Sequence, residues 1–152
     1  MLSVNSQEQI IIFSIQDECY ALTINHVVEI IRVQNITEVP MTRNFIAGVM
    51  NLRGKIIPVV NFRERFRLPS IPFNKKTRVV VVSFEGELVG LIVDEIRMVT
   101  TLHGSELEAT PSMVGGLEKE CFEGFLKNDE MLIGILRLEK VLRLEEEVIT
   151  NG

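Results

Sequence analysis

Short runs of branched apolar residues, bounded by polar turns, recur along the chain, as in "IIIF" at 10–13 and "VVVV" at 79–82. Such runs are typical of β-strands. We expect five strands in each half, at about 9–16, 19–24, 28–33, 47–53 and 55–61, then 78–84, 88–93, 97–102, 115–123 and 131–137. In the first hairpin of each half, Asp17 and Gly86 are the residues expected to take a positive φ.

The second half of the chain repeats the first. Residues 10–31 align without a gap with residues 79–100 at an offset of 69, with apolar over apolar at eight positions and identical residues at Ser14/Ser83 and Glu18/Glu87. The match resumes with 45–49 over 113–117 at an offset of 68, and with 56–68 over 132–144 at an offset of 76. About eight extra residues are therefore expected between Leu117 and Ile133. The alternative is that two sets of β-branched strands resemble each other without duplication.

Each repeat ends in a segment with helical spacing. The apolar and charged positions that show this spacing are Phe62, Phe66, Arg63 and Arg67 in the first repeat, and Leu138, Val141, Leu142 and Glu145 in the second. The segment 69–77, with Pro69 and Pro72, then breaks regular structure. We predict an all-β fold of two five-stranded barrels within one domain over 1–152: the first over about 9–68, a linker at 69–77 and the second over about 78–145, with terminal strands able to exchange.

Composition excludes several classes of protein. The 152 residues carry a net charge of −5, and basic residues cluster only at Arg63, Arg65 and Arg67 and at Lys75, Lys76 and Arg78, which argues against nucleic-acid binding. Cys19 and Cys121 stand alone, as expected for a protein of the reducing cytoplasm. The chain has no signal peptide pattern and no apolar run long enough to span a bilayer, so we expect it to be neither exported nor anchored.

Candidate chemistry is sparse. His26 and His103 fall in different repeats without a nucleophile signature beside them. No HxH, HxxxH or CxxC spacing offers a metal site, and no glycine-rich segment completes a phosphate-binding loop. We therefore predict no catalytic residues, no metal and no cofactor.

One arginine stands out, in "GVMNLRG" at 48–54. By the alignment above, Glu29 lies over Met98, Arg53 over Cys121 and Gly54 over Phe122, so the repeat unit does not require those charges. "NLRGK" reads as a hairpin end from which Arg53 projects, with Glu29 able to pair with it. Two interpretations stay open: a surface ion pair of little consequence for stability, or a guanidinium held by a bidentate contact for recognition at an interface.

Four segments resemble the CheW-type coupling proteins of bacterial chemotaxis: "YALTINHVVEII" at 20–31, "ITEVP" at 36–40, "FIAGVMNLRGKIIPVVNFRERF" at 45–66 and "GLIVDEI" at 90–96. The resemblance covers about residues 8–145. It implies two five-stranded SH3-like barrels enclosing a common hydrophobic core. It also implies a non-catalytic adaptor that links the cytoplasmic tips of methyl-accepting chemoreceptors to the regulatory domain of the histidine kinase CheA, and that meets the membrane only through those receptors.

The resemblance also implies site residues. The receptor-contact region would comprise Val27, Glu29, Gly48, Arg53 and Gly54, with Ile96 lining the same groove between the barrels. Receptor tips are helical hairpins, which an apolar groove flanked by an arginine suits. Kinase contacts would lie on sheet edges and loops, with Val89 and Gly90 as candidates. The chain departs from the family pattern at Arg43, where many members have proline, and at Asn61 and Phe62, where many have Asp-Leu.

Other functions remain open at this point. CheW-like domains also occur within CheA kinases and CheV proteins, but the chain carries neither an ATP-binding segment nor an acidic receiver pattern, which favours a free-standing coupling protein. A small-ligand-binding β-barrel is the alternative from another class, although the inward positions are almost uniformly Val, Ile and Leu rather than the convergent polar groups of a ligand pocket. An enzyme would have to use His26 or His103.

Overall fold

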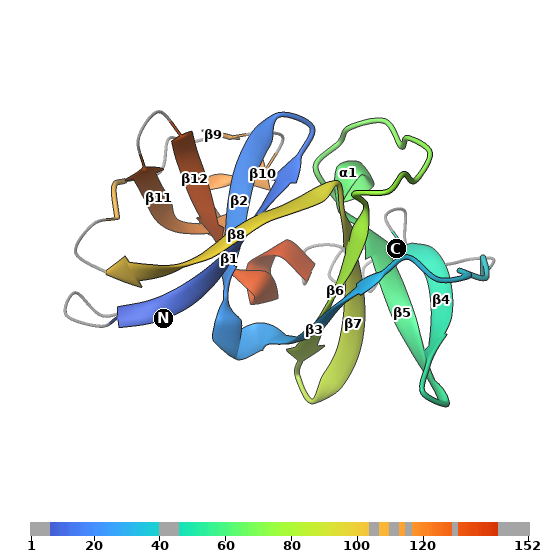
Figure 1. Ribbon diagram of the computed structural model, residues 1–152. Coiled ribbons are helices and arrows are strands. Elements are labelled where there is room, and N and C mark those ends of the chain that lie inside the picture. Colours follow the sequence, from blue (N-terminus) through green and yellow to red (C-terminus); the bar gives the residue numbers. More distant parts are fainter. Residues whose placement is uncertain are drawn as a thin grey trace, which may run out of the picture.

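The computed structural model describes residues 7–39, 46–103, 107–109, 113–114, 117–128 and 131–142 (Figure 1). Its strands are β1 (Gln7–Ile15), β2 (Glu18–Thr23), β3 (Val27–Arg32), β4 (Ile46–Leu52), β5 (Lys55–Asn61), β6 (Arg78–Phe84), β7 (Glu87–Val93), β8 (Glu95–His103), β9 (Met113–Val114), β10 (Leu117–Glu118), β11 (Phe122–Asn128) and β12 (Met131–Leu136). The short helices are η1 (Ile24–His26), α1 (Phe62–Arg65), η3 (Lys119–Cys121) and residues 138–142. None of the helices in the described segments has the length and apolar content needed to cross a bilayer.

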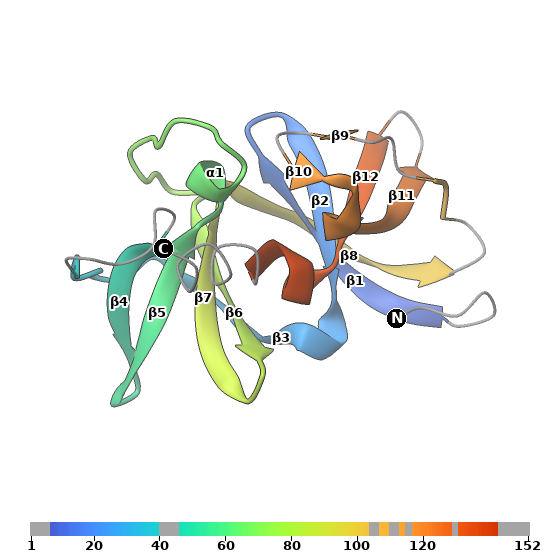
Figure 2. The same cartoon turned by 180° about the vertical axis from the view of Figure 1, so that it is seen from behind.

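The described strands form two five-stranded sheets and a two-stranded one, β9–β10, which confirms the all-β class. Sheet one has the order β11-β12-β2-β1-β8 and sheet two the order β3-β6-β7-β5-β4. Each sheet therefore combines strands from both halves of the chain. Relative to barrels drawn over 9–68 and 78–145, the hairpins β1–β2 and β6–β7 have exchanged places, because the chain passes from one sheet to the other at η1 and again between β7 and β8 (Figures 1 and 2).

Three apolar clusters fill the molecule, because the strands shared between clusters alternate their side chains between two faces. In β6, Val79 and Val81 point into the cluster enclosed by sheet two, whereas Val80 and Val82 point into a cluster shared by both sheets. In β1, Ile10 and Ile12 point into the cluster enclosed by sheet one. Burial on both faces explains why these strands read as unbroken apolar runs rather than as alternating ones.

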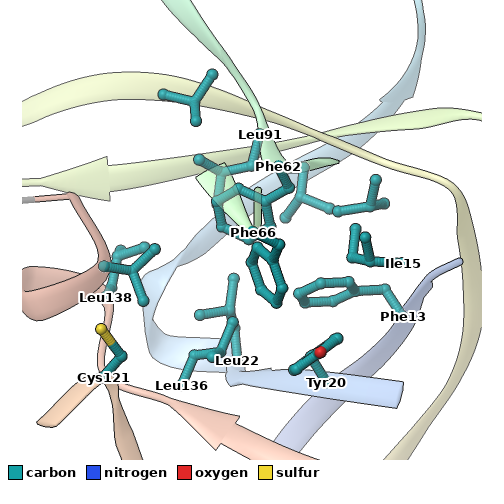
Figure 3. Close-up of a cluster of buried hydrophobic side chains, with 14 of the residues drawn as sticks. Phe13, Ile15, Tyr20, Leu22, Phe62, Phe66, Leu91, Cys121, Leu136 and Leu138 are labelled. Atoms are coloured by element: carbon teal, nitrogen blue, oxygen red, sulfur yellow. The ribbon is translucent and has the colours of Figure 1, made fainter. Parts of the chain in front are cut away.

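The shared core is built around aromatic rings from sheet one and from the α1 segment that follows β5 (Figure 3). Tyr20 of β2 meets Phe66 edge to face with ring centroids 4.6 Å apart, and Phe13 of β1 lies 5.9 Å from Phe62 of α1. Edge-to-face and tilted pairs are the favoured arrangements of buried rings. The common core expected from the resemblance is thus present, and residues from the C-terminal helical turn, among them Leu138, close it.

The structure confirms the duplication and corrects its alignment. β4 and β5 correspond to β11 and β12 at an offset of 76, because a register shift at Ile46/Gly48 recurs at Phe122/Gly124. The match of 45–49 with 113–117 is therefore wrong. The extra residues of the second repeat lie between β8 and β11, where β9, β10 and η3 are found.

Two local predictions were also wrong. The strand expected at 115–123 is β10, a 3-10 turn and the start of β11, because the three buried residues Leu117, Cys121 and Phe122 do not follow a period of two. The positive φ of the first hairpin falls on Gln16, at 59°, rather than on Asp17. The Gly86 prediction is confirmed, with φ of 81°.

Polar links join the two halves at α1. Arg63 forms a bidentate ion pair with Asp94, with Nε–Oδ1 and Nη2–Oδ2 distances of 3.0 and 2.8 Å. Asp94 Oδ2 also accepts the Gln16 backbone N–H at 2.7 Å. The buried Arg65 donates from Nε to the Val141 carbonyl at 2.6 Å. α1 is thereby tied both to the β1–β2 turn and to the C-terminal helix.

Candidate functional site

The β4–β5 turn presents Arg53 at its end. Arg53 and Gly54 have φ values of 49° and 87°, the two successive positive values of a tight hairpin turn. The side chain of Asn51 accepts the Gly54 N–H at 2.8 Å. No atom lies within 4 Å of the position that a Cβ would take on Gly54, so this glycine is required by the backbone conformation and not by packing.

Glu29 holds the Arg53 guanidinium in a bidentate contact. Nη2 donates to Oε1 at 2.8 Å, and Nη1 donates to Oε2. Glu29 lies in β3 and Arg53 directly follows β4. These two strands are the opposite edges of sheet two. The contact therefore spans the closure of the sheet into a barrel.

The pair is exposed on one side only. The Arg53 side chain keeps 72% of its accessible surface, whereas Glu29 keeps 22%. The hydrogen bond from Arg53 lowers the pKa of Glu29, and the same bond raises the pKa of Arg53. The carboxylate is thus the fixed partner, and the guanidinium is held in position while remaining accessible to another molecule.

Gly48 does not belong to this exposed end. It is buried in β4, where Thr37 and Val49 exchange two backbone hydrogen bonds of 2.8 and 2.9 Å. A Cβ on Gly48 would lie 2.2 Å from the Thr37 carbonyl oxygen. The absence of a side chain lets the segment after β3 cross β4, so Gly48 shapes the closure that brings Glu29 and Arg53 together.

Val27 and Ile96 are related by the duplication. Val27 pairs with Val82, Ile96 pairs with Phe13, and a register shift follows each pair. Both side chains are partly buried and pack against the shared core. Each therefore offers an apolar surface at the margin of that core, in opposite sheets.

The structure buries the two residues considered for kinase contact. β7 is the central strand of sheet two, not an edge. Val89 is 9% exposed and belongs to the shared core, and a Cβ on Gly90 would lie 2.8 Å from a methyl group of Val79. Neither residue offers a surface to a partner in this conformation.

The corrected alignment changes one argument about Arg53. At an offset of 76, Arg53 lies over Asp129 and Gly54 over Glu130, not over Cys121 and Phe122. Asp129 and Glu130 lie outside the described residues. The second repeat still has a different pair of residues at the equivalent sequence positions, so the fold unit does not require an arginine there.

Sequence reasoning missed the Arg63–Asp94 contact, although "GLIVDEI" contains Asp94. Of the two departures from the family pattern, Asn61 caps α1 by accepting the Arg63 N–H at 3.0 Å, as an aspartate would. Arg43 lies outside the described residues.

The described residues show no catalytic arrangement. His26 lines a polar cavity with Glu8, Glu123 and Arg137, and His103 lies at the end of β8. Within the described ranges, no group of three or more His, Cys, Asp and Glu side chains could hold a metal ion.

Comparison with known proteins gives the family. The profile of the CheW-like domain matches residues 9–146. The chain belongs to the CheW-like domain family.

Individual relatives agree over nearly the whole chain. The chemotaxis protein CheW of Bacillus subtilis is 33% identical over 93% of this chain and 91% of its own length, and that of Helicobacter pylori is 32% identical over 89% and 81%. Among solved structures, the scaffolding protein TtCheW from Thermoanaerobacter tengcongensis superposes with a TM-score of 0.81 at 34% identity, covering 90% of this chain and 88% of that one.

Proposed function

We propose that this protein is a chemotaxis coupling adaptor that links chemoreceptor tips to the histidine kinase CheA. The observation that carries the proposal is the Arg53 guanidinium, fixed by Glu29 at an exposed hairpin end that the duplicated fold does not need. The relatives support a role in chemotaxis, since they are named as chemotaxis proteins and one solved structure is named as a scaffolding protein.

The receptor surface in this proposal combines one charged and two apolar contributions. Arg53 supplies the charge, and Val27 and Ile96 supply partly buried apolar surface at the margin of the shared core. Glu29 acts by fixing Arg53, and Gly48 and Gly54 act by shaping the hairpin. A helical hairpin with a carboxylate beside an apolar stripe is the partner that this chemistry fits.

The adaptor is proposed to be non-catalytic and cytoplasmic. Its kinase contact is assigned to edge strands and loops, because the burial of Val89 and Gly90 removes them from any surface. A small-ligand-binding barrel is not favoured, because buried apolar side chains fill the space that each sheet encloses. Examples are Ile12 and Ile133 in sheet one, and Met50 and Val81 in sheet two.

The test compares Arg53→Ala with Lys55→Ala, an exposed control at the base of the same turn. Each variant is titrated with a receptor tip fragment and, separately, with the kinase regulatory domain. Arg53→Ala should weaken receptor binding while leaving kinase binding and folding largely intact, and Lys55→Ala should change none of them. If Arg53→Ala loses both partners together with its thermal transition, the arginine is structural and the proposed site is wrong.

Exchanging the charges separates the role of Glu29 from that of Arg53. The double variant Glu29→Arg/Arg53→Glu keeps an ion pair but moves the positive charge. If Arg53 itself contacts the receptor, the double variant should stay folded and still bind weakly. Full recovery of receptor binding would instead show that only the pairing matters.

A further inference from the structure

Two arginines face each other across the edge of sheet two. Arg32, the last residue of β3, pairs directly with Arg78, the first residue of β6. Side chains at directly opposed positions of antiparallel strands lie on the same face and close together, so like charges there reduce stability. Among the described residues, neither arginine forms an ion pair with a carboxylate.

The arginines line a groove that carries a third cation and apolar surface. Its wall includes Lys75, Val33, Ile36 and Phe73, and no Asp or Glu is among the described residues that line it. Phe73 leaves 48% of its surface exposed. In a chain of net charge −5, this groove is a local concentration of positive charge around an exposed aromatic ring.

The turn that leads into β6 is held rigid. The Asn74 N–H donates to Thr77 Oγ1 at 2.9 Å, and Asn74 Oδ1 accepts the Lys76 N–H at 2.8 Å. Arg78 Nη1 donates to the carbonyl oxygens of Lys75 and Thr77 at 2.7 and 2.8 Å. The guanidinium of Arg78 is therefore anchored in place, which lowers the entropic cost of binding an anion.

The duplication shows that the fold does not need this pair. At an offset of 69, Arg32 and Arg78 correspond to Thr101 and Gln9, which pair in the same way between β8 and β1. That pair is neutral. The equivalent position of the other sheet carries no repulsive pair. The opposed arginines therefore indicate a function outside folding.

We propose that this groove docks an acidic segment of a protein partner, with carboxylates meeting Arg32, Arg78 and Lys75 and an apolar side chain meeting Phe73. The positive charge of the groove favours an acidic partner. The exposed Phe73 ring favours a partner that also carries an apolar side chain over a simple polyanion.

Arg32 of the groove points away from the Glu29–Arg53 pair. In the regular part of β3, Ile31 packs against the cluster inside sheet two and Ile30 against the shared core, so Glu29 and Arg32 point to opposite faces of the strand. The docking of an acidic segment stands without the proposed function. The acidic segment is assigned to the kinase regulatory domain rather than to the receptor, and only that assignment rests on the proposed function.

The test transplants the neutral pair of the other barrel. The variant Arg32→Thr/Arg78→Gln is compared with Arg97→Gln, which removes an exposed arginine from β8. Binding is measured by calorimetry at low and high salt. The probes are a peptide of glutamate and leucine, the same peptide with glutamine for glutamate, heparin, the kinase regulatory domain and a receptor tip fragment.

We expect the wild type to bind the glutamate peptide and the kinase domain in a salt-sensitive way. The transplant should weaken both by about tenfold or more and leave receptor binding unchanged. Arg97→Gln should bind as the wild type does. Equal binding of the glutamine peptide, tighter binding of heparin, or unchanged peptide binding by the transplant would each overturn the inference.

Failure of the proposed function has a different signature. A wild type that binds the glutamate peptide but neither the kinase domain nor the receptor fragment would keep the acidic docking groove and remove the adaptor role. A transplant that loses the peptide and the receptor fragment, but not the kinase domain, would assign the groove to the receptor and overturn the kinase assignment.

Discussion

The carbonyl oxygen of Thr37 lies 2.2 Å from the point where a Cβ atom of residue 48 would stand, so only glycine fits beneath it. The φ of Gly48 is 152°, a conformation that L side chains rarely adopt. The two backbone hydrogen bonds between Thr37 and Val49 fix the segment after β3 to β4 at this point. Closure of sheet two into a barrel therefore depends on the absence of a side chain at Gly48.

Gly48→Ala should lower the free energy of unfolding by roughly 2 kcal/mol or more, because the new methyl group meets a backbone oxygen and the backbone is strained. Urea denaturation measures the loss. Gly124→Ala is the matched control at the equivalent position, where the nearest atom is 2.9 Å away, and it should cost less. A Gly48→Ala protein as stable as the wild type would contradict the crossing of Thr37 over β4.

The Tyr20 hydroxyl should lose its proton at an unusually high pH. Burial is the main cause that raises its pKa from 10.0 to about 12. Because the folded-state pKa lies above the unfolded one, Tyr20 stabilises the fold fully below pH 10, and this contribution is lost as pH rises toward 12. The chain has one tyrosine and no tryptophan, so ultraviolet difference absorbance reports this group alone. A native titration near the unfolded value would mean that the shared core admits water.

Arg65→Met should destabilise the junction between α1 and the C-terminal helix. It removes the charge-assisted bond to the Val141 carbonyl, which is worth about 1.5–3 kcal/mol. Cys121 lies fully buried beside this arginine, and burial raises the pKa of its thiol. Labelling of Cys121 by a thiol reagent should therefore become faster in the variant.

Lys140→Met is the control for this experiment, since Lys140 is exposed on the same helical turn. It should leave both stability and Cys121 labelling as in the wild type. Equal labelling rates in Arg65→Met and the wild type would show that Arg65 does not hold the helix in place.

The Glu29 carboxyl should titrate below its usual range, because Arg53 donates to its charged form. A lowered pKa in the folded state gives a stabilisation that is present at neutral pH and is lost as pH falls through the folded-state pKa. Carboxyl NMR titration measures it. Arg53→Met should return the Glu29 pKa toward its ordinary value, whereas Lys55→Met should not.

The candidate site was predictable in part. The Glu29–Arg53 pair followed from two charges that interrupt apolar strands, and the hairpin turn at Gly54 followed from its local sequence. The burial of Val89 and Gly90 was not predictable, because an apolar run does not reveal whether its strand is central or at an edge. The pairing of Arg32 with Arg78 depends on the register between strands that are far apart in the sequence.

The sequence by itself determined most of the strands, the duplication and the turns at Gly54 and Gly86, because these depend on neighbours along the chain and on the period of apolar residues. The tertiary structure alone decided which hairpin joined which sheet and which edge strands met. These depend on long-range pairing, where similar apolar strands compete and crossing segments such as that at Gly48 select the closure. Only this folding brings Glu29 to Arg53 and sets Arg32 opposite Arg78.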